Sequence, residues 1–435
     1  MRDTIAISFL RNEAVSLLSR LQQVKPFTLS MPMVWAAGIS DAAMRGITNH
    51  MSNGIKELKE RIYSFISSLN EEGEIPAAKT QAKFCLLKLR FNNILDQFDI
   101  FADVLSQRSE QNTGVWIAGL DVLANDVLQL TKKLYEMPPV MCFLERGHGA
   151  AIRKARTRLP GGDFNPVSII QVPRERMVGS GIAASVIHEA GHQGAALLNL
   201  VASLRNAIVK KERSDPLNNT AWSLYNLWIS EIIADVWAMG HLGIGATLGL
   251  MGVVSLPEYF MFRIKTDDPH PFPWIRVRLS IAFGKYFYPH PQWDQLFQLW
   301  HRLYPTEQLS EEQKKILRVL EQTIPAFIRL LAHHRNKELN DLELKEIFPL
   351  RQRQPPQLQH FFSHWKNNND EMRLSSPSLV FAVIAQAKAD KKISEETECR
   401  LLEKMLAQWA FMVSENRTFK ESAKIATELH PFINI

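Results

Sequence analysis

The chain has 435 residues, of which 46% are hydrophobic and 22% charged, proportions that suit a globular protein with two or three domains. The formal net charge of +6 is spread along the chain. No run of Lys and Arg is interleaved with aromatic residues, so the sequence does not predict nucleic-acid binding. The cysteines, Cys85, Cys142 and Cys399, lie far apart and predict neither a disulfide framework nor a cysteine-rich zinc site.

The amino terminus lacks the pattern of a secretory signal. Asp3 stands where such a signal has basic residues, and the apolar stretch after it is interrupted by Arg11 and Glu13. So few cysteines are typical of a reducing compartment. We therefore predict a cytoplasmic protein.

Residues 1–137 are predicted to form a helical bundle, since apolar residues recur at three- and four-residue spacing. The predicted helices cover 5–21, 55–69, 79–105 and 115–135, and the stretch 26–51 is less regular. The bundle carries no chemical motif. It is either a docking module or a structural support.

Pro138 and Pro139 mark the start of a second region, which we expect to extend to residue 280. A basic stretch over 141–162 is followed by the best strand in the chain, over 166–173. This strand is rich in β-branched residues and is bounded by prolines.

The next helical stretch, 183–200, contains the sequence His188-Glu189-Ala190-Gly191-His192. Residues four apart share one face of a helix, so His188 and His192 can offer two imidazole nitrogens to one metal ion. Glu189 lies beside that face and can accept a proton from a metal-bound water. We expect this helix to continue to about residue 209.

A further helix is predicted over 221–239, and it places Glu231 and Asp235 on one face. A catalytic zinc site with two His ligands needs a third ligand, for which Glu231 is the candidate. Asp235 is the candidate for an outer carboxylate that orients a ligand imidazole. A buried salt bridge or an exposed acidic stripe is the alternative interpretation of this pair.

The apolar stretch over 239–256 is interrupted by His241 and five glycines. It is also short for a membrane span, which needs about 20 residues. We therefore predict a buried helix, or a pair of helices packed closely through glycine.

A third motif follows, in which His270-Pro271 precedes Arg276 in a proline-rich segment. Together, the pattern H-E-x-x-H, the pair Glu231 and Asp235, and this motif resemble the gluzincin zinc peptidases, and among them the M48 type. The resemblance covers residues 185–278. The distance to Glu231 is longer than in thermolysin, and the membrane spans of many M48 enzymes are missing. The metzincin pattern is excluded, since Ala195 and Leu198 occupy its Gly and third His positions.

The resemblance implies a zincin-like core with bound Zn²⁺ and a place for His270 and Arg276 at the active site. His270 would donate a hydrogen bond to the developing oxyanion, and Arg276 would pair with a carboxylate such as Asp235. Zinc peptidases often add the substrate as one more strand to an edge strand before the metal helix. On that basis the substrate-binding candidates are Ile169, Ile170 and Gln171.

Residues 281–435 are predicted to be helical again. Ser310 begins a capping box for a helix that ends near Ala332, and the stretch 351–359 has the composition of a linker. The loop over 389–396 lies between two helical stretches, and residues 375–430 resemble the small helical modules of the TerB type. The loop lacks the ligand spacing of an EF-hand, so no calcium site is predicted.

The predicted fold is mainly α, with helical regions on both sides of a zincin-like α+β metallopeptidase core that has a small sheet. The predicted function is zinc-dependent hydrolysis of peptide bonds in a protein or peptide substrate. Two alternatives remain open: a non-catalytic zinc-bearing scaffold whose helical flanks bind partners, and a motif present by accident.

Overall fold

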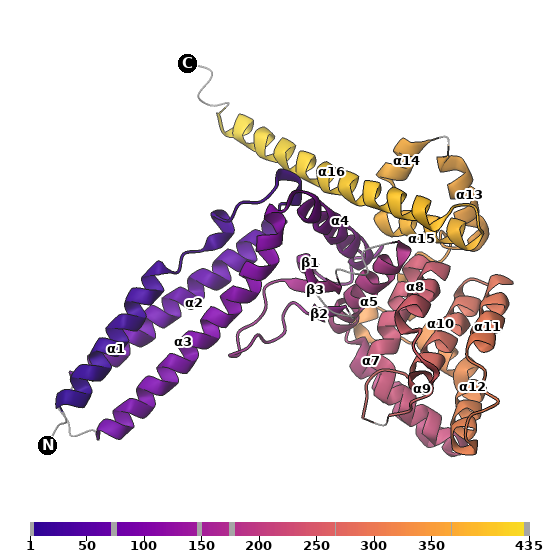
Figure 1. Cartoon of the computed structure of the whole chain (residues 1–435), viewed down its shortest axis with the longest axis horizontal. Helices are drawn as coiled ribbons and strands as arrows, with labels where there is room; N and C mark the ends of the chain where they lie inside the picture. Colours follow the sequence, from indigo (N-terminus) through magenta and orange to yellow (C-terminus); the bar gives the residue numbers. More distant parts are fainter. Residues whose placement is uncertain are drawn as a thin grey trace. The chain divides into compact units, whose positions relative to one another are not determined.

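The computed structural model describes residues 4–70, 76–145, 150–173, 179–265, 267–366 and 368–429, and it is mainly helical with one small sheet (Figure 1). Contacts divide the chain into two units. One consists of Met1–Val115, Pro138–Met141 and Arg153–Ile169, and the other of Trp116–Met137, Cys142–Ile152 and Ile170–Ile435. This division follows contacts alone, so the three functional domains expected from the sequence stay a prediction.

Three long helices make up most of the first unit: α1 (Thr4–Gln23), α2 (Asp41–Ser68) and α3 (Ala77–Ser106). Each packs against the other two, and they lie side by side in Figure 1. The short 3₁₀ turns η1 (Phe27–Leu29), η2 (Trp35–Ala37) and η3 (Gln107–Ser109) accompany them. The helices of the predicted bundle are therefore present in this unit.

The prediction of an irregular segment as far as residue 51 was wrong in its second half, because α2 already begins at Asp41. The Ser40 side chain accepts a hydrogen bond from Ala43 N, which caps the helix. Ala43, Ile47 and Met51 are buried at four-residue spacing. The apolar stripe was overlooked because glycines and polar residues separate its members.

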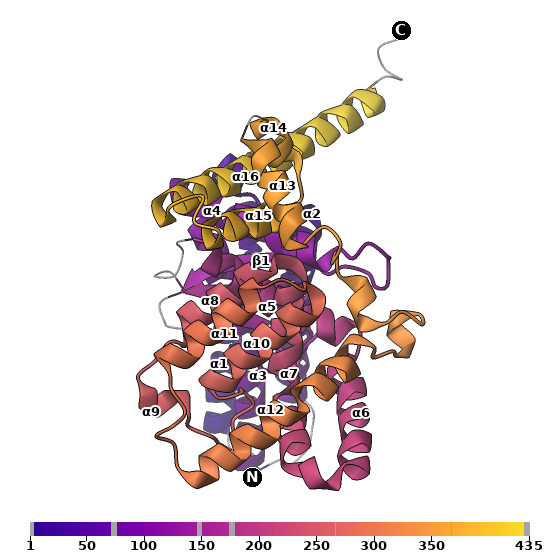
Figure 2. The same cartoon turned by 90° about the vertical axis from the view of Figure 1, so that its right-hand side faces the viewer.

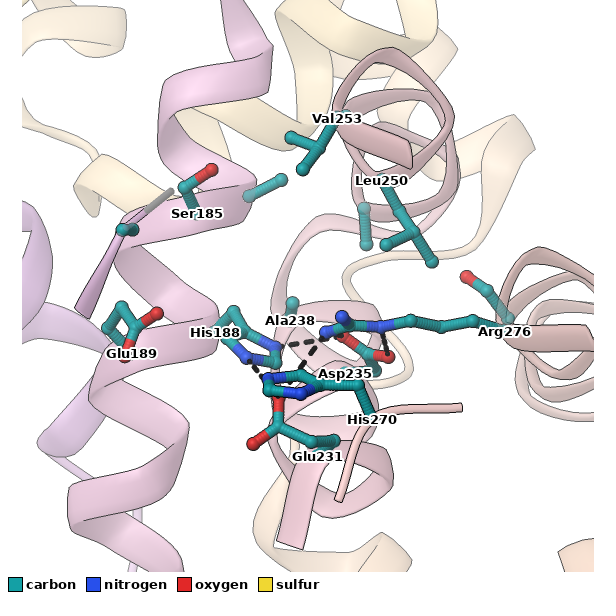
Figure 3. A pocket seen from close by; sticks show the side chains of 15 residues that line it. Ser185, His188, Glu189, Glu231, Asp235, Ala238, Leu250, Val253, His270 and Arg276 are labelled. Atoms are coloured by element: carbon teal, nitrogen blue, oxygen red, sulfur yellow. Dashed lines mark hydrogen bonds and ion pairs between the residues drawn. The ribbon is translucent and has the colours of Figure 1, made fainter. Parts of the chain in front are cut away.

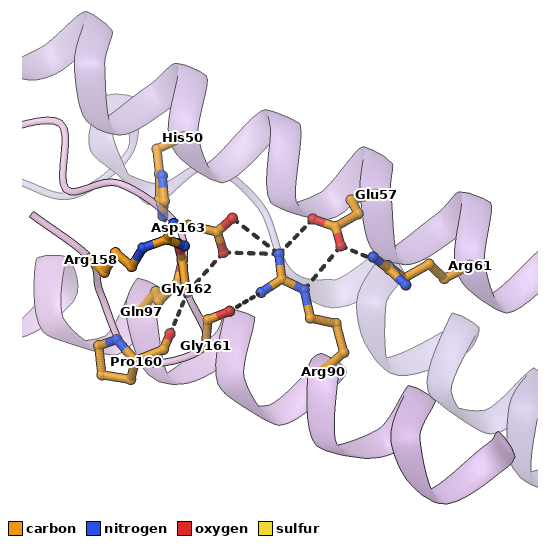
Figure 4. Close-up of polar contacts among 10 residues, drawn as sticks. All are labelled: His50, Glu57, Arg61, Arg90, Gln97, Arg158, Pro160, Gly161, Gly162 and Asp163. Carbon is orange, nitrogen blue, oxygen red and sulfur yellow. Dashed lines mark hydrogen bonds and ion pairs between the residues drawn. The ribbon is translucent and has the colours of Figure 1, made fainter. Parts of the chain in front are cut away.

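A polar cluster links α2, α3 and the loop that ends at Asp163 (Figure 4). Arg90 of α3 donates to both carboxylate oxygens of Glu57, to Asp163 and to the carbonyl of Gly161. Gln97 donates to Asp163 and to the carbonyl of Pro160. Because these charges are paired inside the unit, the cluster stabilises the loop against the helices.

Helix α4 (Gln111–Leu128) leads into the sheet, whose strands are β1 (Val140–Glu145), β2 (Ala151–Arg153) and β3 (Ser168–Pro173). The strand predicted over 166–173 is confirmed as β3. Strands β1 and β2 were not predicted, because basic and glycine-rich residues dominated the stretch that contains them.

The expectation that β3 is an edge strand was wrong. The strand order is β1-β3-β2, so β3 has a hydrogen-bonded neighbour on each side. A substrate cannot add to a strand whose two edges are already paired along the sheet. The side chains of Ile169 and Ile170 are also buried, at 2% and 0% exposure, and Gln171 lies between buried neighbours.

The second unit holds the remaining helices, seen from the side in Figure 2. They are α5 (Ser180–Leu197), α6 (Leu200–Ser214), α7 (Asn219–Leu242), α8 (Ile244–Val254), α9 (Glu258–Met261), α10 (Pro273–Phe287), α11 (Gln292–Leu303), α12 (Glu311–Ala332), α13 (Pro355–Trp365), α14 (Asn369–Leu374), α15 (Pro377–Ala389) and α16 (Glu395–Leu429), with the 3₁₀ turns η5 (Pro216–Asn218), η6 (Lys337–Leu339) and η7 (Leu344–Ile347).

Helices α5 and α7 pack closely through glycine. A Cβ atom at Gly191 would lie 2.7 Å from the Cβ of Trp237, and one at Gly194 would overlap the same indole ring. The Trp237 ring is fully buried there and donates to the carbonyl of Val127. The glycine inside the H-E-x-x-H motif therefore allows α7 to approach the face of α5 that carries the two histidines.

The expectation of one helix continuing to residue 209 was wrong. Asn199 adopts a left-handed conformation at φ 49°, which ends α5 and starts α6 in a new direction. The prediction for 239–256 is confirmed as a helix pair, because Gly243 at φ 55° separates α7 from α8. Among the described residues, no helix combines the length and hydrophobicity that a membrane crossing requires.

The capping box at Ser310 and the helix end at Ala332 are confirmed in α12. The loop predicted between two helical stretches lies between α15 and α16. The linker expected over 351–359 was wrong, since α13 begins at Pro355 and Arg353 is only 2% exposed. Proline is favourable in the first turn of a helix, and here it was misread as a sign of a linker.

Candidate metal centre

His188 and His192 lie one turn apart on α5 and present their rings to the same side. Their ring centroids are 4.9 Å apart with the planes nearly perpendicular. Their side chains are 13% and 12% exposed. The helical spacing thus brings two imidazoles together, as the sequence predicted.

Glu231 of α7 faces both rings. Its Oε2 lies 3.3 Å from Nε2 of His188, and its Oε1 lies 3.4 Å from Nε2 of His192. One ligand atom from each residue lies within 4.8 Å of the other two. Ligand atoms about 2.0–2.1 Å from a tetrahedral zinc ion are about 3.3 Å apart, so this donor set fits the ion.

The charges at this point favour a cation. Burial alone would lower the pKa of His188, but Asp235 and Glu231 outweigh it and raise that pKa to about 9. Burial would raise the pKa of Glu231, whereas the histidines and Arg276 bring it down to about 2. A carboxylate that stays ionised beside two imidazoles suits a divalent metal ion.

Asp235 and Arg276 lie behind the ligands, and the pair predicted between them is present (Figure 3). Arg276 donates from Nε to Oδ2 of Asp235 at 2.7 Å and from Nη2 to Oδ1 at 2.9 Å. Nδ1 of His188 lies 2.8 Å from Oδ1 of Asp235, although the angle is poor for a hydrogen bond. With Nδ1 facing a carboxylate, Nε2 of His188 is left to face Glu231.

Glu189 lies on the same helix and is only 6% exposed. Its pKa is raised, mainly by burial, and the nearby charge of Glu231 adds to the effect. A carboxyl group in this state can exchange a proton near neutral pH more readily than an exposed one can.

His270 comes from the loop before α10, and its side chain is 55% exposed. Its Nε2 lies 3.5 Å from Oε2 of Glu231. Asp268 Oδ1 accepts from His270 N at 3.0 Å and lies 2.9 Å from Nδ1 of the ring. The role of Asp268 in holding this loop was missed, although an Asp two residues before His270 is the signature of an Asx turn.

A cavity of about 200 Å³ opens over the cluster (Figure 3). Its polar wall includes His188, Glu189, Glu231, His270 and Arg276. Its apolar wall comes largely from α8 and was not predicted: Ala246, Gly249, Leu250 and Val253. Ile169, Ile170 and Gln171 are not among the described residues that line this cavity.

No protein family model, no curated protein and no solved structure matches this chain. The argument for function therefore depends on the residues and their geometry.

Proposed function

We propose that the protein is a zinc-dependent endopeptidase with a gluzincin-like site in a zincin-like core over residues 138–280. The main support is the meeting of His188 and His192 with Glu231 at ligand separations that suit zinc. Zinc held by these three residues would polarise the scissile carbonyl and make a bound water more acidic. The proposal follows from the donor set together with the buried carboxyl group beside it.

Glu189 would act as the general base and then as the general acid. It would accept a proton from the attacking water and pass it to the leaving nitrogen of the peptide. Its raised pKa suits the second step, because the carboxyl group must hold the proton before it gives it up.

His270 would donate a hydrogen bond from Nε2 to the oxygen of the scissile carbonyl as negative charge develops there. Because the carboxylate of Asp268 can only accept, Nδ1 of the ring carries a proton when it faces Asp268. Donation from Nε2 then requires the doubly protonated ring.

A zinc-bearing scaffold without activity is the alternative. A structural zinc site has four protein ligands and no need for a general base, whereas a catalytic site keeps a position open. The cavity over the cluster and the buried Glu189 therefore favour the enzyme.

The test is Glu189→Gln, which keeps the shape of the side chain and removes its ability to accept a proton. We expect the variant to keep its fold and one zinc ion per chain, and to lose cleavage of a quenched peptide library by about 10²- to 10⁴-fold. Glu258→Gln, an exposed position on α9, is the matched control. Cleavage by Glu189→Gln at the wild-type rate would reject this mechanism.

A further inference from the structure

The two helices that carry the candidate metal ligands end against charged side chains from distant parts of the chain. The amino terminus of α5 meets Glu398 of α16, and the carboxyl terminus of α7 meets Arg353, in the turn before α13. Both side chains are buried, at 1% and 2% exposure. Buried charges at such places need a reason, because each loses its hydration.

Glu398 caps α5. Its Oε1 accepts from Ser180 N at 3.1 Å, and its Oε2 accepts from Lys388 Nζ at 2.8 Å. The chain makes room for it at Gly179, where φ is 81° and an added Cβ would lie 2.9 Å from Oε2. A negative charge stabilises the amino terminus of a helix, where the first N–H groups have no partner inside the helix.

Arg353 caps α7 in the opposite sense. Its Nε donates to the carbonyl of His241 at 2.7 Å, and its Nη2 donates to Oγ of Ser378 at 3.0 Å. Tyr288 adds a second donor, from its hydroxyl to the carbonyl of Gly240 at 3.0 Å. A positive charge stabilises the carboxyl terminus of a helix, so both capping charges have the favourable sign.

We propose that Glu398 and Arg353 are positioning residues of the metal centre, through which residues 281–435 set how α5 lies against α7. This inference rests on the proposed metal site. Ser180 is eight residues before His188, and His241 is ten after Glu231, so each cap lies roughly 12–15 Å along a rigid helix from its ligand. A small shift at either cap would change the separation of the imidazoles from Glu231.

The experiment uses the full-length protein, freed of metal and titrated with Co²⁺ against a competing chelator. The visible absorption of Co²⁺ reports the coordination geometry, and circular dichroism reports whether each variant is folded. The variants are Glu398→Gln, Glu398→Ala and Arg353→Lys. Glu403→Gln, an exposed position on α16, is the matched control.

We expect Co²⁺ affinity to fall severalfold in Glu398→Gln, which keeps an oxygen for Ser180 N, and roughly tenfold or more in Glu398→Ala. Arg353→Lys should also weaken binding, since an ammonium group cannot reproduce the fork of a guanidinium. The absorption band should change in the folded variants and stay unchanged in Glu403→Gln. If Glu398→Ala does not fold, Lys388→Met provides a milder variant, because Lys388 is 31% exposed and only fixes the carboxylate.

Wild-type affinity and an unchanged band in the folded Glu398 and Arg353 variants would overturn the positioning role alone. Wild-type protein that binds Co²⁺ no better than His188→Ala would reject the proposed metal site, and this inference with it.

Discussion

Asp235 determines which nitrogen of His188 is left to face Glu231. Its carboxylate lies between Nδ1 of His188 and the guanidinium of Arg276, and burial there is outweighed by these two charges, so its pKa is well below the ordinary range. An asparagine at this position would keep the shape but lose the charge that holds both partners. The residue therefore acts on the metal ion through His188.

We predict that Asp235→Asn weakens zinc binding by about 10- to 100-fold, because carboxylates behind a ligand imidazole typically contribute that much. Competition with a chromogenic chelator measures the affinity. Asp267→Asn, at an exposed position in the loop before His270, should bind zinc like the wild type. Equal affinity in both variants would show that Asp235 does not tune the ligand.

His270 is the second residue whose role can be isolated. We predict that His270→Ala retains zinc and loses turnover by about 10²- to 10³-fold, the typical effect of removing one oxyanion donor. Peptide cleavage and zinc content are measured on the same samples, with His360→Ala, an exposed position on α13, as the control. Loss of zinc would instead make His270 a ligand, and unchanged turnover would make it an ordinary loop residue.

At the scale of elements, the cluster around Arg90 joins α2 and α3 to the loop at Asp163 through groups that titrate in acid. The hydrogen bond from Arg90 lowers the pKa of Glu57. Burial would raise the pKa of Asp163, but Arg90 and Gln97 bring it below its ordinary value. Burial also lowers the pKa of His50, whose Nε2 lies 2.8 Å from Oε1 of Gln97.

All three pKa values are lower in the folded state than in the unfolded chain. The stabilising contribution is therefore complete above the unfolded values, and it is lost as the pH falls through the folded ones. For His50 the loss begins below about pH 6.5, and for the two carboxyl groups below about pH 4.

We therefore predict that α2 and α3 lose protection against amide hydrogen exchange between pH 7 and pH 3.5. In Arg90→Met the loss should be smaller, since the carboxyl groups no longer have a favourable charge to lose. Mass spectrometry of peptides from the two helices, corrected for intrinsic exchange, measures the effect. Arg45→Met, an exposed position on α2, is the control, and an equal pH dependence in all three proteins would contradict the prediction.

At the scale of the whole molecule, the metal centre couples ligand binding to the stability of the second unit. Glu189, Glu231 and Asp235 gather around two imidazoles, and Arg276 is the cation that pairs with Asp235. An ion that binds only the folded state stabilises it by about 2.7 kcal/mol at a free concentration one hundred times its Kd.

We predict that a chelator lowers the unfolding temperature of the second unit and leaves that of the first unit unchanged. Differential scanning calorimetry with and without EDTA measures both transitions. His188→Ala should unfold at the lower temperature and no longer respond to EDTA. A shift of both transitions, or of neither, would argue against a metal ion bound in the second unit.

The sequence by itself determined the features that depend on local geometry. The four-residue spacing of His188 and His192 predicts a shared face in any helix, and the same rule applies to Glu231 and Asp235. The capping box at Ser310 depends on residues three apart, and the helix pair at Gly243 follows from glycine's freedom at positive φ. These features needed no knowledge of what packs against them.

Only the tertiary structure decided the features that join distant residues. The central place of β3 depends on its partner strands, and the apolar wall from α8 depends on how that helix packs on α5. Glu398 and Arg353 gave no local signal, because each meets its helix end across more than 100 residues of sequence. Local spacing cannot report such contacts, since packing selects them after the helices have formed.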